Sequence, residues 1–113
     1  MEEIISNLTL EIRRGTLVIS VLSQLKKAQY GYSLVQSLTE KGLVIDQSTL
    51  YPLLRRLEKQ ELLDSNWLVD EARPRRYYVL NDKGNEVLAR LMLEWKAMNE
   101  LVTSLLDEEE SEK

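Results

Sequence analysis

The stretch from Ser48 to Glu61 constrains the fold more than any other part of the chain. Its apolar residues recur at helical spacing and form one stripe, made of Leu50, Leu54 and Leu57. The opposite face and its flanks are polar and carry Ser48, Tyr51, Arg55, Arg56 and Lys59. We therefore predict a helix that packs on a core with one face. The polar face is consistent with two interpretations. The helix is either an ordinary amphipathic surface helix or one that contacts bases and phosphates of DNA.

The distribution of charge matters more than the net charge of −4. Residues 107–113 hold five acids and one base, whereas the rest of the chain has 14 of each. The acidity therefore belongs to one terminal stretch, and the neutral body can gather cations on one face. The low overall pI is thus weak evidence against binding to nucleic acid.

The side-chain inventory removes most catalytic chemistry. The chain has 113 residues, a length at which one domain is expected. It contains no cysteine and no histidine. Disulfides, thiolate or histidine zinc sites, and Ser-His or Cys-His catalysis are excluded. No Asp/Glu spacing indicates a carboxylate site, so no enzyme, metal or cofactor is expected. No acceptable signal peptide or membrane-spanning run is present, so we expect a cytoplasmic protein without a membrane partner.

Two helical segments precede the central helix. The first is predicted from Asn7 or Thr9 to about Lys27, with Gly15 as a weak point. Residues 29–31 are interpreted as a turn, followed by a helix over 32–41. Gly42 stands where a left-handed helix cap is expected. Residues 43–45 are apolar and include the β-branched Val44 and Ile45, which favours an extended connector. Asp46, Ser48 or Thr49 could cap the central helix.

Alternation replaces helical spacing after Glu61. Strands are predicted over 64–69 and 75–80, because Trp67 with Val69 and Tyr77 with Val79 each share one side. The intervening turn, residues 70–76, holds Arg73, Arg75 and Arg76 around a proline. Three arginines at a hairpin tip favour contact with phosphates or the minor groove over a plain solvated turn.

The last helix is predicted from Asn81 or Asp82 to about Leu106. Its apolar residues are spaced alternately by three and four, which makes a heptad seam of Leu88, Leu91, Trp95, Met98, Val102 and Leu105. Packing against the first helix can cover only part of so long a seam. An interface with a second copy of the chain is therefore favoured.

These elements predict a mainly α fold with a small β-hairpin. Residues 1–80 would form a winged helix-turn-helix domain, with the wing at about 64–80. Residues 81–106 would form a C-terminal dimerisation helix, and residues 107–113 an acidic, disordered tail.

Four stretches in this order resemble the PadR family of bacterial transcriptional regulators. They are Gly15-Thr-Leu, Tyr30-Gly-Tyr-Ser-Leu34, Ser48 to Lys59, and Arg75-Arg-Tyr-Tyr-Val-Leu80 followed by Gly84. The short C-terminal part is similar to the smaller PadR subgroup, which includes multidrug-sensing members. Asn81 replaces a commoner threonine, and Glu61 stands where the family often has glycine.

The resemblance implies a homodimeric repressor that binds double-stranded DNA at a palindromic operator and is released by a small aromatic or drug-like ligand. The implied DNA contacts are Ser48, Thr49, Tyr51, Arg55, Lys59, Arg73, Arg75 and Arg76. The implied effector site at the dimer centre comprises Trp95, Leu88, Leu91, Met92, Met98, Asn99 and Ser20. Leu91 and Met92 are bulky enough to fill such a site, and Trp95 equally suits a dimer core. An alternative function is a winged-helix interaction or dimerisation module that does not bind DNA.

Overall fold

The computed structural model describes residues 1–70 and 73–111, with side chains over 1–68 and 74–107. Seven elements follow in order: α1 (Glu2–Ser23), β1 (Gln29–Tyr30), α2 (Gly31–Glu40), α3 (Gln47–Lys59), β2 (Leu63–Asp70), β3 (Arg73–Leu80) and α4 (Asp82–Ser111). The described part of the chain is thus mainly helical with a small antiparallel sheet, which confirms the predicted fold class.

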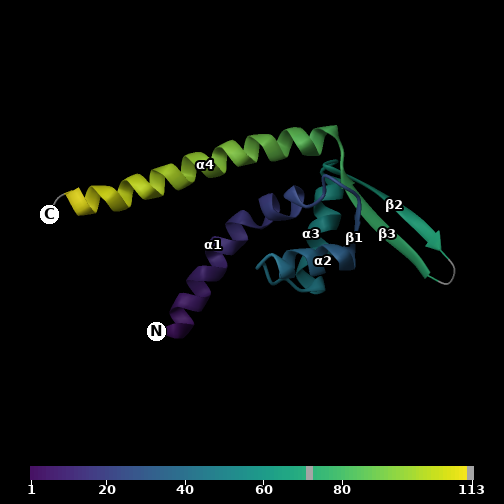
Figure 1. Cartoon of the computed structure of the whole chain (residues 1–113), viewed down its shortest axis with the longest axis horizontal. Helices are drawn as coiled ribbons and strands as arrows, with labels where there is room; N and C mark the ends of the chain where they lie inside the picture. The colour runs from purple at the N-terminus through teal and green to yellow at the C-terminus, as the bar shows by residue number, and fades with distance from the viewer. Residues whose placement is uncertain (71–72, 112–113) are drawn as a thin grey trace.

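The core lies where α1, α2, α3 and the sheet meet. Figure 1 shows α1 and α4 leaving this core in a V, while the β2–β3 hairpin projects in the opposite direction. The predicted apolar stripe of α3 is buried in this core: Leu50, Leu54 and Leu57 have at most 1% of their surface exposed. The remaining core is mostly leucine and includes Val21, Leu22, Leu25, Leu34, Leu38, Leu63, Tyr78, Leu80 and Leu88.

The sheet has three strands in the order β1-β3-β2, where the sequence predicted only two. Gln29 and Tyr30, which we interpreted as part of a turn, pair with Tyr78 and Tyr77 of β3. A strand of two residues has no alternation of its own. Its partner lies almost fifty residues away, so local sequence could not reveal it.

The hairpin strands are longer than predicted. They pair from Leu63↔Leu80 to Asp70↔Arg73. The prediction that all three arginines lie in a turn is therefore wrong, because β3 already begins at Arg73. The tip at residues 71–72 lies outside the described residues. Arg75 and Arg76 are adjacent in a strand, and their side chains consequently point to opposite faces.

Two helices differ from their predicted bounds. Helix α1 begins at Glu2 rather than near Asn7, since Glu2 and Glu3 favour the positive N-terminal end of the helix dipole, and it ends earlier, at Ser23. Helix α4 continues to Ser111, so residues 107–111 are helical and the prediction of a disordered tail over them is wrong. Glutamate has a high helix propensity, which supports this extension. Residues 112–113 lie outside the described residues.

Two caps were predicted correctly. Gly42, which follows the C-terminal cap residue Lys41 of α2, has φ +103°. Asn81 caps α4, because its Oδ1 accepts a hydrogen bond of 2.8 Å from the N–H of Gly84. Among the described residues, no helix is both long and apolar enough to cross a membrane.

Candidate nucleic-acid interface

The outward face of α3 is polar and unobstructed. Ser48, Arg55 and Lys59 are exposed, while the leucine stripe holds the helix on the core. Arg55 and Lys59 form no side-chain ion pair with the residues that the structure describes. A rigidly held helix with free cations on its outer face can place them against phosphates or base edges.

The start of α3 is fixed by Asp46. Its Oδ1 accepts hydrogen bonds from the Thr49 N–H at 2.9 Å and from the Ser48 hydroxyl at 2.7 Å. Hydrogen bonds from Ser48 and Thr49 lower the pKa of the Asp46 carboxyl below its ordinary value of 3.8. The predicted DNA contacts Ser48 and Thr49 are both exposed, and the Ser48 hydroxyl also takes part in the cap.

Tyr51 lies on the flank of α3 and packs inward. Its ring rests on Gly31 at the start of α2, where even one added methyl group would collide with it. The side chain is half-buried against the core. Tyr51, which the family resemblance implied as a DNA contact, is therefore first a contact between α2 and α3.

Arg75 is held by two tyrosines that the sequence analysis did not assign to the site. Its Nη1 donates a hydrogen bond of 3.1 Å to the Tyr32 hydroxyl, and its guanidinium lies 5.7 Å and 5.6 Å from the ring centroids of Tyr30 and Tyr32. The two rings stack, with centroids 6.0 Å apart. Arg75 remains exposed. The pairing of β1 with β3 brings the three together.

Arg76 has a different environment from its neighbour. It is half-buried and forms an ion pair of 2.7 Å with Glu58 of α3. Its guanidinium also lies over the ring of Tyr78, whose pKa is raised by burial while Arg76 acts to lower it. Thus Arg76, predicted as a DNA contact, has partners inside the chain. The Arg73 side chain lies outside the described side chains.

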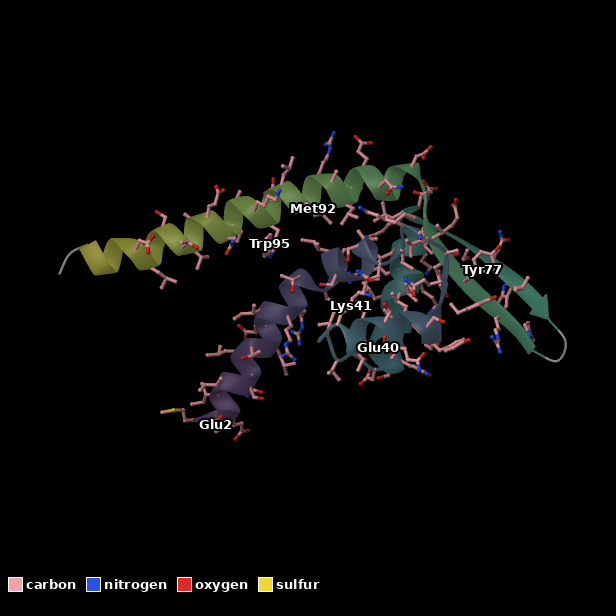
Figure 2. All side chains as sticks on the ribbon, in the orientation of Figure 1. Glu2, Glu40, Lys41, Tyr77, Met92 and Trp95 are labelled. Atoms are coloured by element: carbon pink, nitrogen blue, oxygen red, sulfur yellow. The ribbon has the colours of Figure 1, made fainter. Side chains whose placement is uncertain are left out.

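A second candidate site lies in the V between α1 and α4. A groove of about 620 Å³ is lined from α4 by Leu91, Trp95, Met98, Asn99 and Val102, and from α1 by residues that include Gly15 and Ile19. A neighbouring hollow of about 470 Å³ shares Trp95 and adds Ser20 and Met92. In Figure 2, the Trp95 side chain points from α4 toward α1. The predicted effector residues other than Leu88 therefore line this groove or the neighbouring hollow.

Leu88 is an exception within the predicted seam. It is only 3% exposed and belongs to the chain's own core. This contradicts its assignment to both the effector site and the dimer interface, because little of its surface is left for another molecule. The later seam residues Trp95, Met98, Val102 and Leu105 are each 46–59% exposed.

The arrangement of α1, α2, α3 and a β-hairpin defines a winged helix-turn-helix protein. The model of the transcriptional regulator PadR-like family matches residues 18–90, well over half of the chain. The chain belongs to this family, as the resemblance of its motifs predicted. Members of the family are transcriptional regulators rather than enzymes.

Solved structures agree with this assignment. A PadR family transcriptional regulator from Eggerthella lenta is 48% identical, with a TM-score of 0.91 over 93% of this chain and 94% of that one. A PadR-like transcription factor from Bacteroides fragilis is 36% identical, with a TM-score of 0.75 over 88% and 98%. Bacillus subtilis PadR, solved in complex with operator DNA, is 21% identical over 68% and 45%, with a TM-score of 0.63, and shares the fold.

Proposed function

We propose that the chain is a homodimeric, sequence-specific DNA-binding repressor. The observation that carries this proposal is the division of α3 into a leucine face buried in the core and an outer face with exposed Arg55 and Lys59. Side chains on this face would contact base edges in the major groove. The structure of Bacillus subtilis PadR with operator DNA supports a DNA ligand for this fold.

The wing would add contacts to the DNA backbone. Arg75 is exposed and oriented by Tyr30 and Tyr32, so less side-chain entropy is lost when it meets a phosphate. Neutralised phosphates release counterions, and this release would supply much of the affinity and its dependence on salt. Arg55, Lys59 and Arg75 are the cations to which we assign these contacts, with Ser48 and Thr49 at the start of α3.

A second copy would cover the apolar surface inside the V. Helix α4 exposes Met98, Val102 and Leu105, and α1 exposes Ile5 and Ile12, each at least 46% accessible. So many exposed large apolar side chains on adjoining helices are typical of an interface. A two-fold dimer would present two copies of α3 to two half-sites of a palindromic operator.

A flat aromatic ligand would bind in the groove beside Trp95. The groove lining is predominantly apolar, and Asn99 supplies an amide for a polar group of the ligand. Because the same helices would form the dimer interface, a ligand there could change the separation of the two copies of α3. It would release DNA only if it bound the altered spacing more tightly than the DNA-competent spacing.

Binding to the protein's own upstream DNA and to a scrambled duplex, measured across a salt series, tests the proposal. We expect selective binding, and we expect Arg55→Ala and Arg75→Ala each to weaken it and to make the salt dependence shallower. Arg90→Ala is the matched control, since it removes one exposed cation from α4, where Arg90 forms an exposed ion pair with Glu86. Equal, weak binding to all duplexes, including those recovered from a genome-wide pull-down, would contradict the proposal. It would favour the alternative function, a winged-helix interaction or dimerisation module that does not bind DNA.

A further inference from the structure

We propose that Glu58 and Arg76 are positioning residues for DNA binding, because their ion pair fixes the wing at a set angle to the recognition helix α3. The inference rests on the proposed function and assigns Arg76 a different role from that of its neighbour Arg75. Arg76 would act through Glu58 and would not contact DNA.

The pair joins α3 directly to β3. Arg76 Nη2 lies 2.7 Å from Glu58 Oε1 and 2.8 Å from Oε2, so one nitrogen bridges both carboxylate oxygens. The side chains are 34% and 26% exposed, whereas both partners in the other ion pairs of the described residues are at least 57% exposed. Partial burial reduces screening by water and salt, so this pair restrains the two elements more than a surface pair would.

Ser65 connects the second strand of the wing to the same pair. Its hydroxyl donates to Glu58 Oε2 and accepts from Arg76 Nε at 3.1 Å and Nη2 at 2.9 Å. Ser65 lies on β2 opposite Tyr78, two positions along β3 from Arg76. One network of hydrogen bonds therefore holds α3, β2 and β3 together.

Two aromatic rings enclose the guanidinium of Arg76. Its central carbon lies 5.6 Å from the ring centroids of both Trp67 and Tyr78. Trp67 is the cross-strand partner of Arg76 and is 60% exposed, while Tyr78 belongs to the core. The rings attract the cation and limit its rotation. Arg76 would have to abandon these contacts to reach a phosphate.

The position of the pair gives it influence over DNA binding. Arg76 directly follows Arg75, the exposed cation of the wing, and Glu58 directly precedes Lys59 on α3. Because strand residues alternate in direction, one arginine can face DNA while the next is anchored to α3. Without the anchor, the hairpin could sample several angles, and DNA binding would have to select one of them at a cost in affinity.

Variants that remove one charge of the pair distinguish this role from direct contact with DNA. We expect Glu58→Gln and Arg76→Gln each to weaken operator binding about tenfold, roughly the effect of one charged hydrogen bond. The salt dependence should not change, because no phosphate contact is lost. The double variant should bind no more weakly than the weaker single variant, since both changes remove the same interaction. Arg90→Gln, which breaks the exposed pair with Glu86, should have no effect.

The direct-contact model predicts the opposite sign for Glu58. If Arg76 contacted a phosphate, Glu58→Gln would remove a competing carboxylate and strengthen binding, while Arg76→Gln would make the salt dependence shallower. Either result overturns the proposal. Ser65→Ala provides a milder variant should Arg76→Gln fail to fold, and it should weaken binding by a smaller factor with unchanged salt dependence.

Hydrogen exchange of the free protein tests the anchor without DNA. Amides of β2 and β3 should exchange faster in Glu58→Gln than in the unaltered chain, whereas those of α2 should not change. Unchanged exchange in the hairpin would overturn the positioning role even if the protein binds its operator. If the hairpin of Glu58→Gln exchanges faster but the unaltered protein shows no DNA preference, the ion pair still anchors the hairpin, and the proposed function is refuted instead.

Discussion

Leu88 and Trp95 lie two turns apart on one face of α4, yet Leu88 is 3% exposed and Trp95 is 46% exposed. The difference arises because α1 and α4 diverge from the core, as Figure 1 shows. The chain itself therefore covers only the first part of the heptad seam. The remaining part exposes apolar side chains that a second copy would cover.

We expect Met98→Asp to weaken dimerisation by about tenfold or more. A carboxylate placed in an apolar interface loses hydration without gaining a partner, which costs more than the 1.4 kcal/mol that corresponds to a factor of ten. Sedimentation equilibrium over a range of concentrations would measure the effect. Ser104→Asp is the matched control, because Ser104 is exposed on the opposite face of α4. Equal dimerisation of the two variants would exclude the seam as the interface.

Local sequence predicted those features that depend on near neighbours. Leu50, Leu54 and Leu57 are buried together because helical spacing alone places them on one face. Gly42 and Asn81 occupy their predicted cap positions, since caps need only residues within a turn of the helix end. The motifs around α3 and β3 were likewise sufficient to indicate the family.

Features that depend on distant partners could not be predicted. Nothing near Arg76 indicates that Glu58, on another element, will pair with it, and so the sequence suggested that Arg76 is equivalent to Arg73 and Arg75. The strand at Gln29–Tyr30 exists only through its pairing with β3. The heptad pattern assigned Leu88 to a seam between copies, although it is buried in the chain's own core.

Glu61→Gly should stabilise the fold by about 1 kcal/mol. Helices α2 and α3 end alike, with Leu43 N–H bonded to Leu38 O and Leu62 N–H bonded to Leu57 O. The left-handed residue is Gly42 after α2 but Glu61, with φ 64°, after α3. A side chain in this conformation costs about 1–2 kcal/mol. The lost contact of 3.7 Å with Lys83 is highly exposed and contributes little.

Urea unfolding monitored by circular dichroism would measure this gain. Gly42→Ala is the complementary variant, because it introduces at α2 the strain that Glu61→Gly removes at α3, and we expect a loss of similar size. If Glu61→Gly were neutral or destabilising, the left-handed conformation of Glu61 would not be a source of strain.

Gly84→Ala should destabilise the protein by about 1–3 kcal/mol, the usual cost of overpacking. A methyl group at Gly84 would overlap the carbonyl oxygen of Leu62 and lie 2.9 Å from Leu80 Cδ2. The Leu62 carbonyl oxygen also accepts a hydrogen bond from the Asn81 N–H, so it cannot move aside without disturbing the start of α4. Thermal unfolding would report the change. Glu86→Ala, on an exposed part of the same helix, should change stability little, and a similar result for Gly84→Ala would contradict this packing.

A planar aromatic compound that binds beside Trp95 should quench its fluorescence in a saturable manner. The groove around Trp95 has a volume of about 620 Å³, sufficient for a compound of several fused rings. Trp67→Phe removes the second tryptophan signal and keeps a ring over Arg76. Asn99→Leu should weaken binding of a ligand with a polar edge. Quenching that is linear in concentration and unaffected by Asn99→Leu would indicate collisions only.

The contribution of Asp46 to stability should disappear in acid. Its pKa is lowered in the folded state by hydrogen bonds from Ser48 and Thr49, so the ionised carboxylate favours folding. This stabilisation is fully present above the ordinary value of 3.8 and is lost as the pH falls through the lower folded value. The stability difference between the unaltered chain and Asp46→Ala should therefore be constant from about pH 7 to about pH 5 and shrink below about pH 4.

Asp46→Asn retains an N-cap that does not titrate, so its difference in stability from Asp46→Ala should stay the same over this range. Urea unfolding at several pH values would distinguish the two, and parallel curves for all three proteins would mean that the Asp46 cap does not depend on its charge.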